Sequence, residues 1–359
     1  MKHIGTRRLI GALAVAALAA TACSSGNASP TNTAAKKCTP AKTPVINFAA
    51  YSTPREVYDA KIIPAFEAYW KQKHNGQSLL FEESYAGSTA QSQAVVNGLP
   101  ADIVALSLAP DVDAIKNAGL ITHDWTKAPD KGMVSTSVVA LDVRPGNPKH
   151  IKDFNDLTQP GLQILTPDPA QSGGARWNIV GAYGAAMRGY AGNKKNDSAG
   201  AEKLLQGIFK NVTVMDKSAR DSIQNYESGN GDVAITYENE ILNAQAAGLP
   251  DQAVYPPSTI LIQNPVAVVD KNAQAHCVEN IANAFVKFLH TKQAKDFYST
   301  VGFLRSTNMA LAKKGDPKAH MPAIKDLFTV DDLGGWSAVD QKLFSSNGLF
   351  TQALKAAQG

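Results

Sequence analysis

The sequence predicts an α/β protein of two lobes with a ligand cleft between them. Three observations lead to this prediction. Short apolar segments alternate with amphipathic ones, which is the pattern of a sheet covered by helices. Strong breaks near residues 133–138 and 256–262 enclose a self-contained α/β block, so the chain leaves one lobe, builds a second and returns. A chain of 359 residues is long enough for two lobes of ordinary size.

The expected elements follow this division. In the first block a helix starts near residue 54, and the other elements are strands at 45–49, 79–83, 103–106 and 138–143 and helices at 89–97 and 112–118. The second block has strands at 163–165, 212–215 and 233–237 and helices at 175–188 and 219–227. After the second break come an extended segment at 266–269 and helices at 278–290 and 293–299. We therefore assign residues 44–134 and 260–359 to lobe 1 and residues 135–259 to lobe 2.

The N-terminal residues are expected to lie outside both lobes. Residues 1–22 have a basic start and an apolar core too short to span a membrane, which predicts a signal peptide. The run Ala20-Thr21-Ala22-Cys23 resembles a lipoprotein signal, so Cys23 is expected to be acylated. The chain would then be anchored to the outer face of the cytoplasmic membrane, with residues 23–43 as a flexible tether. Ordinary secretion is the alternative.

Charge, cysteine and histidine content narrow the function further. Removal of residues 1–22 leaves 32 Lys plus Arg against 31 Asp plus Glu. The mature chain therefore lacks the basic field that nucleic-acid binding needs. In an exported chain Cys38 and Cys277 are expected to form a disulfide, and two free thiols are the alternative. The seven histidines lack the spacing of metal ligands, so no metal and no other cofactor is expected.

Four predicted strand-to-helix junctions begin with a hydroxyl residue suited to cap a helix N-terminus. They are Thr53-Pro54-Arg55-Glu56, Ser88-Thr89-Ala90-Gln91, Ser172-Gly173-Gly174-Ala175-Arg176 and Ser218-Ala219-Arg220-Asp221. Each helix start leaves backbone N–H groups without partners and has a partial positive charge. Several such starts at the carboxyl ends of neighbouring strands can bind an anion without a formal cation. Ordinary capping is the alternative, but Gly173-Gly174 favours a ligand that contacts the bare backbone.

The run Thr166-Pro167-Asp168-Pro169-Ala170-Gln171-Ser172-Gly173-Gly174-Ala175-Arg176-Trp177-Asn178 resembles the signature of bacterial sulfate-binding proteins. Five shorter motifs strengthen the resemblance: Asp111-Val112-Asp113-Ala114-Ile115, Arg144-Pro145-Gly146-Asn147-Pro148-Lys149, Gly231-Asp232-Val233, Glu238-Asn239-Glu240 and Gly334-Gly335-Trp336. The resemblance runs from about Val45 to the C-terminus. It implies a type II periplasmic-binding-protein fold, in which the ligand lies in the cleft between the lobes.

The resemblance also implies a set of ligand-binding residues. Matched position by position, they are Ser52, Ser88, Ser172, Gly173, Gly174, Ala219 and Tyr237. Two positions depart from the family pattern, because Ser52 stands where the family has an aspartate and Tyr237 where it has a tryptophan. A phenol O–H can donate a hydrogen bond as the indole N–H does. Supporting positions, with each guanidinium bonded to backbone carbonyls or acids, are expected for Arg55, Asp111, Arg176 and Arg220.

These residues are hydrogen-bond donors, which suits sulfate, because sulfate has no proton at neutral pH. The predicted function is capture of sulfate by a monomeric binding protein and its delivery to the permease and ATPase of an ABC importer. Thiosulfate, molybdate or tungstate are alternative ligands. An enzyme is less expected, because the chain has no Gly-x-Ser-x-Gly elbow, Ser-x-x-Lys pair, HExxH motif or phosphate-binding P-loop.

Overall fold

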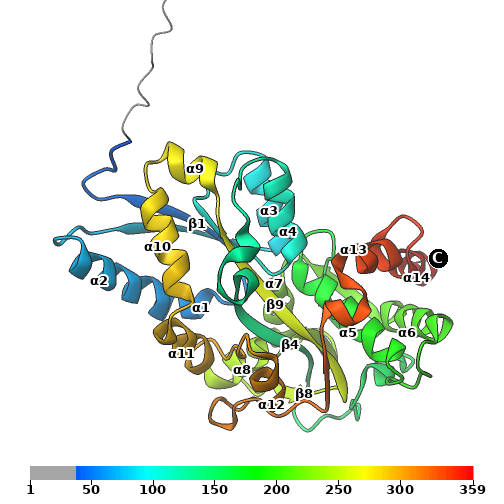
Figure 1. Ribbon diagram of the computed structural model, residues 1–359. Coiled ribbons are helices and arrows are strands. Elements are labelled where there is room, and N and C mark those ends of the chain that lie inside the picture. The colour runs from blue at the N-terminus through cyan, green and yellow to red at the C-terminus, as the bar shows by residue number, and fades with distance from the viewer. Residues whose placement is uncertain (1–37, 359) are drawn as a thin grey trace, which may run out of the picture. The chain divides into compact units, whose positions relative to one another are not determined.

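The computed structural model describes residues 38–358, and the chain from Thr39 onward forms one compact unit. Its centre is a ten-stranded sheet in the order β2-β1-β3-β9-β4-β7-β5-β6, with β10 beside β9 and β8 beside β4 (Figure 1). The strands are β1 Val45–Tyr51, β2 Leu80–Ala86, β3 Ile103–Ala105, β4 Met133–Val143, β5 Ile164–Pro167, β6 Val212–Asp216, β7 Val233–Tyr237, β8 Gln252–Val254, β9 Ser258–Val268 and β10 Asp326–Phe328. The predicted signal peptide, Cys23 and most of the predicted tether lie outside the described residues.

Two long strands, β4 and β9, join the two ends of the sheet. At one end β1 pairs parallel with β2 and β3, and at the other β5 pairs parallel with β6 and β7. β4 and β9 pair antiparallel with each other between these groups, and each also pairs antiparallel with one of them (Figure 1). They coincide with the two predicted breaks, so the chain crosses between the parallel groups as extended strands.

Helices cover both parallel groups (Figure 1). Apart from short 3-10 and π turns they are α1 Arg55–Val57, α2 Ile63–Lys73, α3 Ser88–Val96, α4 Ala109–Asn117, α5 Gly173–Met187, α6 Ser198–Lys210, α7 Ala219–Glu227, α8 Glu238–Ala246, α9 Asp270–Ala275, α10 Glu279–Leu289, α11 Lys292–Thr300, α12 Met309–Lys314, α13 Gly335–Val339 and α14 Leu349–Gln358. α5 is buried along almost its whole length. A Cβ at Gly181 would already touch Val139 and Ile260, so small residues let α5 lie directly on β4 and β9.

The side chains form two large cores. One joins β1, β3, α2 and α10 around Phe48, Phe66 and Phe285. The other joins β4, β5, β7, α5 and α6 and also contains residues from Phe328 to Ala353. The division into lobes is still a proposal. This packing would move the C-terminal helices α13 and α14 from lobe 1 to lobe 2, because their apolar side chains are buried there.

Two of the four expected helix caps are confirmed. Ser172 accepts a hydrogen bond from the Ala175 N–H, and Ser218 accepts one from the Asp221 N–H. The other two predictions are wrong. The short helix α1 has Pro54 as its N-cap residue, not Thr53, and no side chain caps it.

At α3 the N-cap residue is Gly87, and Ser88 is the first helical residue. The Ser88 hydroxyl donates to Asp111 Oδ2. Ser88 Oγ in turn accepts the Ser107 N–H at 2.9 Å, so its oxygen serves the segment after β3 rather than an N–H of α3.

A buried acid at the end of β4 makes stability depend on pH. Asp142 is 0 % exposed, and burial together with nearby Asp251 raises the pKa of Asp142 to about 8. Because this pKa is higher folded than unfolded, the contribution of Asp142 is fully present at low pH and is lost as pH rises through about 8. We expect Asp142→Asn, which can still accept from the Gln252 N–H, to unfold at a higher temperature than the parent at pH 8.

Thermal unfolding between pH 5 and pH 9 tests this expectation. The melting temperature of Asp142→Asn should vary less with pH than that of the parent. The exposed Asp296→Asn variant is the control and should follow the parent curve. An equal loss of melting temperature at every pH would show that the Asp142 carboxyl matters only for packing.

Candidate anion-binding site

A small cavity of about 10 Å³ lies where the carboxyl ends of strands from both parallel groups meet. The carboxyl ends of β1, β2 and β3 supply lining residues from one group, and those of β5, β6 and β7 supply them from the other. The lining residues are Tyr51, Ser52, Thr53, Ala86, Gly87, Ser88, Ser107, Ser172, Gly174, Ala219 and Tyr237. Cavities for drug-sized ligands are typically 300–1,000 Å³. This cavity therefore suits a small ion rather than an organic ligand.

Three helix N-termini, those of α3, α5 and α7, meet at this cavity. A Cβ at Gly174 would lie 3.3 Å from Ala219 Cβ, so the starts of α5 and α7 are adjacent. A Cβ at Gly87 would lie 2.5 Å from the Gln171 carbonyl oxygen and 2.7 Å from that of Lys217, so only glycine fits before α3. Among residues 38–358, the N–H groups of Ser88, Gly174 and Ala219 have no hydrogen-bond partner. Free N–H groups at converging helix starts are suited to bind an anion.

The cavity brings together six of the seven predicted ligand residues: Ser52, Ser88, Ser172, Gly174, Ala219 and Tyr237. The seventh, Gly173, is the first residue of α5 and packs against Ser107 beside the cavity. Sequence reasoning missed five lining residues: Tyr51, Thr53, Ala86, Gly87 and Ser107. Three of these adjoin predicted residues in the chain, and Ala86 lies two residues before Ser88. Ser107 had no such signal, since it follows β3 as a single serine.

All the lining residues are neutral, and seven of the eleven have a hydroxyl group. Burial raises the pKa of Tyr237 far above its ordinary value, so the phenol keeps its proton. Ser172 caps α5 through its oxygen and has its hydroxyl proton left to donate. The cavity therefore presents hydroxyl and backbone donors without a formal cation.

Asp111 lies behind Ser88 rather than in the cavity wall. It accepts from the hydroxyls of Ser88 and Thr89. Burial raises the pKa of Asp111 to about 6, although these two hydrogen bonds and the charge of Arg176 lower it. Because the Ser88 proton is held by Asp111, the group that Ser88 offers to the cavity is its backbone N–H.

The three predicted supporting arginines each pair with an acid, but none with Asp111 among the described residues. Arg55 pairs with Asp59 on the surface, and Arg176 pairs with Asp340. Arg220 is the most connected: its guanidinium lies 2.6 Å and 2.8 Å from the Glu56 carboxylate oxygens, 3.0 Å from Glu240 and 3.2 Å from the Thr53 carbonyl oxygen. It thereby joins α7 and α8 to the loop after β1.

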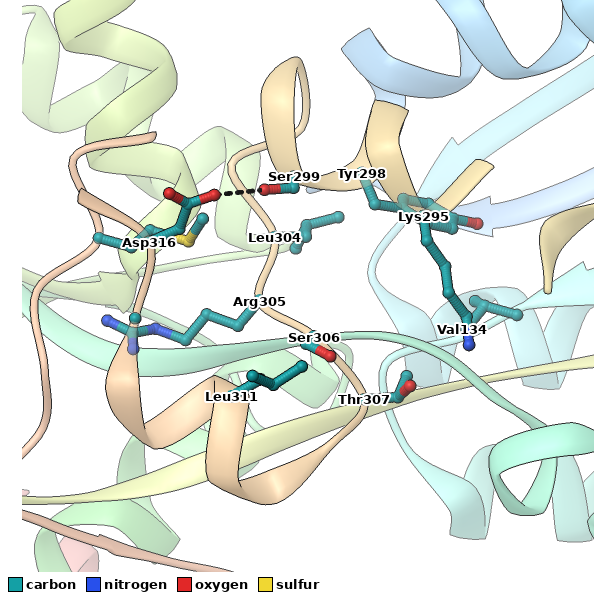
Figure 2. Close-up of a pocket in the computed structure, with 12 residues that line it drawn as sticks. Val134, Lys295, Tyr298, Ser299, Leu304, Arg305, Ser306, Thr307, Leu311 and Asp316 are labelled. Carbon is teal, nitrogen blue, oxygen red and sulfur yellow. Dashed lines mark hydrogen bonds between the residues drawn. The ribbon is translucent and has the colours of Figure 1, made fainter. Parts of the chain in front are cut away.

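A larger cavity of about 240 Å³ lies between α11, α12 and the loop 304–307 (Figure 2). Its polar groups already have partners within the fold. Lys295 pairs with Asp130, Ser299 donates to Asp316, and the Arg305 guanidinium pairs with Glu238. In the part of the chain that the structure describes, this cavity therefore lacks the converging free donors found at the smaller one.

The remaining predictions concern the two cysteines, metal binding and membrane-spanning segments. Cys38 and Cys277 are each disulfide-bonded, which removes the alternative of free thiols, and their pairing with each other is still a prediction. In residues 38–358 no cluster of three or more His, Cys, Asp or Glu side chains is arranged to hold a metal ion. Nor does that part of the chain contain a helix with the length and apolarity of a membrane span.

The chain is similar to proteins named for binding sulfate and thiosulfate. A sulfate-binding protein of Synechococcus elongatus is 41% identical over 317 residues, which are 88% of this chain and 87% of the relative. A thiosulfate-binding protein of Escherichia coli is 33% identical over 318 residues, 86% of this chain and 91% of the relative.

The solved structure of the sulfate-binding protein SubI from Mycobacterium tuberculosis superposes with a TM-score of 0.74 at 35% identity, covering 84% of this chain and 99% of that one. This match confirms the predicted two-lobed α/β fold class. The family model described as "Bacterial extracellular solute-binding protein" matches residues 46–304. The chain therefore belongs to the bacterial extracellular solute-binding proteins, as its resemblance to sulfate-binding proteins predicted.

Proposed function

We propose that this chain binds sulfate outside the cytoplasm and delivers it to an ABC importer. The observation that carries the proposal is the small cavity of neutral donors at the N-termini of α3, α5 and α7. The proposed ligand residues are Ser52, Ser88, Ser172, Gly173, Gly174, Ala219 and Tyr237. Relatives named for sulfate and thiosulfate binding support the same class of ligand.

The donors in the cavity favour sulfate over phosphate. Phosphate keeps a proton at neutral pH and needs an acceptor for it, whereas sulfate has none. Asp111 and Glu240, the two acids whose charges act on Tyr237, do not line the cavity. Asp111 accepts from Ser88, and Glu240 forms an ion pair with Arg220. An unpaired buried donor on phosphate would cost about 1–3 kcal/mol.

Thiosulfate is the second candidate ligand, because it shares the charge and the tetrahedral shape of sulfate. Molybdate and tungstate are larger, and the small cavity favours them less. We propose a binding protein rather than an enzyme. Its expected partners are a membrane permease and its ATPase, and we propose a monomer anchored through an acylated Cys23. The proposed hinge is the β4–β9 pair, around which the two lobes would close on the ligand.

Calorimetric titration of the purified chain, stripped of anion, tests the proposal. We expect saturable binding of sulfate near micromolar affinity, which is about −8 kcal/mol. The affinity for thiosulfate should equal that for sulfate or be lower, and phosphate should give no signal. Phosphate binding with the same affinity as sulfate would contradict the donor-only site. Absence of binding to every oxyanion would contradict the proposed function.

The Arg220–Glu56 ion pair should hold the two sides of the site together. Glu56 is partly exposed, so we discount the pair to at most about 1 kcal/mol. Glu56→Gln should therefore weaken sulfate binding up to about fivefold, mainly by faster release in stopped-flow measurements. Asp59→Asn removes the neighbouring surface pair and is the control. Release rates equal in both variants would show that the pair does not act on the bound state.

A further inference from the structure

Ser107 lines the cavity, and no motif assigned it a role. Its backbone is held from two sides: its N–H donates to Ser88 Oγ at 2.9 Å, and its carbonyl oxygen accepts the Trp177 indole N–H at 2.8 Å. Its side chain is buried, and its hydroxyl lies 2.7 Å from the Tyr237 hydroxyl. Hydrogen bonds therefore fix both the backbone and the side chain of Ser107 at the cavity.

The two hydroxyls have one proton more than their shared hydrogen bond can use. Ser107 and Tyr237 carry two hydroxyl protons, and only one of them lies between the two oxygens. Among residues 38–358 neither hydroxyl has another hydrogen-bond partner. A buried O–H without an acceptor is costly. The second proton is therefore best placed toward the cavity that both residues line.

The same cavity wall contains the start of α5. A Cβ at Gly173 would lie 2.7 Å from Ser107 Oγ, so the serine hydroxyl rests directly against the bare backbone of that residue. The free N–H groups of α5 and the spare O–H therefore lie next to each other. An oxyanion bound by the N–H groups of α5 would be within reach of this spare O–H.

We propose that Ser107 is an anion-binding residue, and that Ser107 and Tyr237 together supply one O–H donor to the bound oxyanion. This inference rests on the proposed function. Tyr237 stands where the resembled family has a donor-only indole N–H. A hydroxyl pair differs from an indole because either oxygen can be the one that donates to the anion, while the other donates to its neighbour.

Because either hydroxyl can donate, loss of one should cost less than loss of both. We expect Ser107→Ala and Tyr237→Phe each to weaken sulfate binding about threefold. In the Tyr237→Phe background, Ser107→Ala should weaken it at least another tenfold, since no O–H is then left. Sulfate titration calorimetry of the full chain and the three variants measures this.

Ser92→Ala is the matched control. Ser92 is an equally buried serine on α3 that donates to the Asp111 carbonyl oxygen and does not line the cavity. It should lower the melting temperature of the sulfate-free chain and leave the sulfate affinity unchanged. If Ser107→Ala causes no further weakening in the Tyr237→Phe background, the inference is wrong. If the unsubstituted chain itself fails to bind sulfate, the proposed function is wrong instead.

Discussion

Gly174→Asp should abolish sulfate binding, with an affinity loss of at least about a thousandfold. Gly174 lines the cavity at the start of α5, and a Cβ there would lie 3.3–3.4 Å from Ala219, Ser172 and Tyr237, which must shift by a few tenths of an ångström to accept it. The added carboxylate would lie within a few ångströms of the bound dianion. Two unit charges 4 Å apart at an effective dielectric constant of 20 repel by about 4 kcal/mol, which is a factor of roughly a thousand.

Gly174→Asn is the matched control, since asparagine has nearly the shape of aspartate without its charge. It should fold equally well and lose far less affinity than Gly174→Asp. Calorimetric titration and thermal unfolding of both variants separate charge from bulk. Equal losses in the two variants would place the anion away from α5. Gly173 is the poorer position for this test, because any Cβ there would strike Ser107 Oγ and Leu108.

Arg305→Met should lower the free energy of unfolding by about 4 kcal/mol. Arg305 and Glu238 form an ion pair in which both side chains are at most 1 % exposed. The guanidinium also donates to the carbonyl oxygens of Ala312 and Pro322, so it ties the segment after α11 to α8. Burial raises the pKa of Glu238 and Arg305 lowers it. Without the arginine that pKa rises further, so the loss should be larger at pH 8 than at pH 5.

Urea unfolding of Arg305→Met, Arg305→Met/Glu238→Gln and Lys292→Met tests this expectation. The double variant should recover part of the loss, because no unpaired carboxylate stays buried. Lys292 pairs with Asp296 on the surface, and its replacement should cost less than about 1 kcal/mol. A loss for Arg305→Met as small as that for Lys292→Met would contradict the assigned role of the buried pair.

The sequence predicted the parts of the site whose chemistry is local. Ser172 and Ser218 cap their helices as expected, because each hydroxyl needs only a backbone N–H three residues ahead. Ser88 does not cap α3, because its oxygen accepts the N–H of Ser107, 19 residues further along the chain, while its proton goes to Asp111. Tyr237 was identified only through resemblance. Ser107 could not be identified at all, since its role depends on a tyrosine 130 residues away.

As with the site, the parts of the fold that were predicted are those that local sequence patterns determine. Alternation of apolar and amphipathic segments located most of the central strands and the helices beside them. It did not show that α14 packs on α6, with Phe350 against Phe209, because nothing local in either segment specifies its partner. For the same reason the ion pairs of Arg220 and Arg305, which join distant segments, emerged only from the structure.

The most direct test of the central claim is the position of a bound oxyanion in a crystal of the selenate-loaded chain. Selenate is a tetrahedral dianion like sulfate, and the anomalous scattering of selenium locates it without ambiguity. We expect one peak in the cavity between the N-termini of α3, α5 and α7, within hydrogen-bond distance of Ser172 Oγ and the Gly174 N–H. A peak elsewhere, with none in this cavity, would contradict the account.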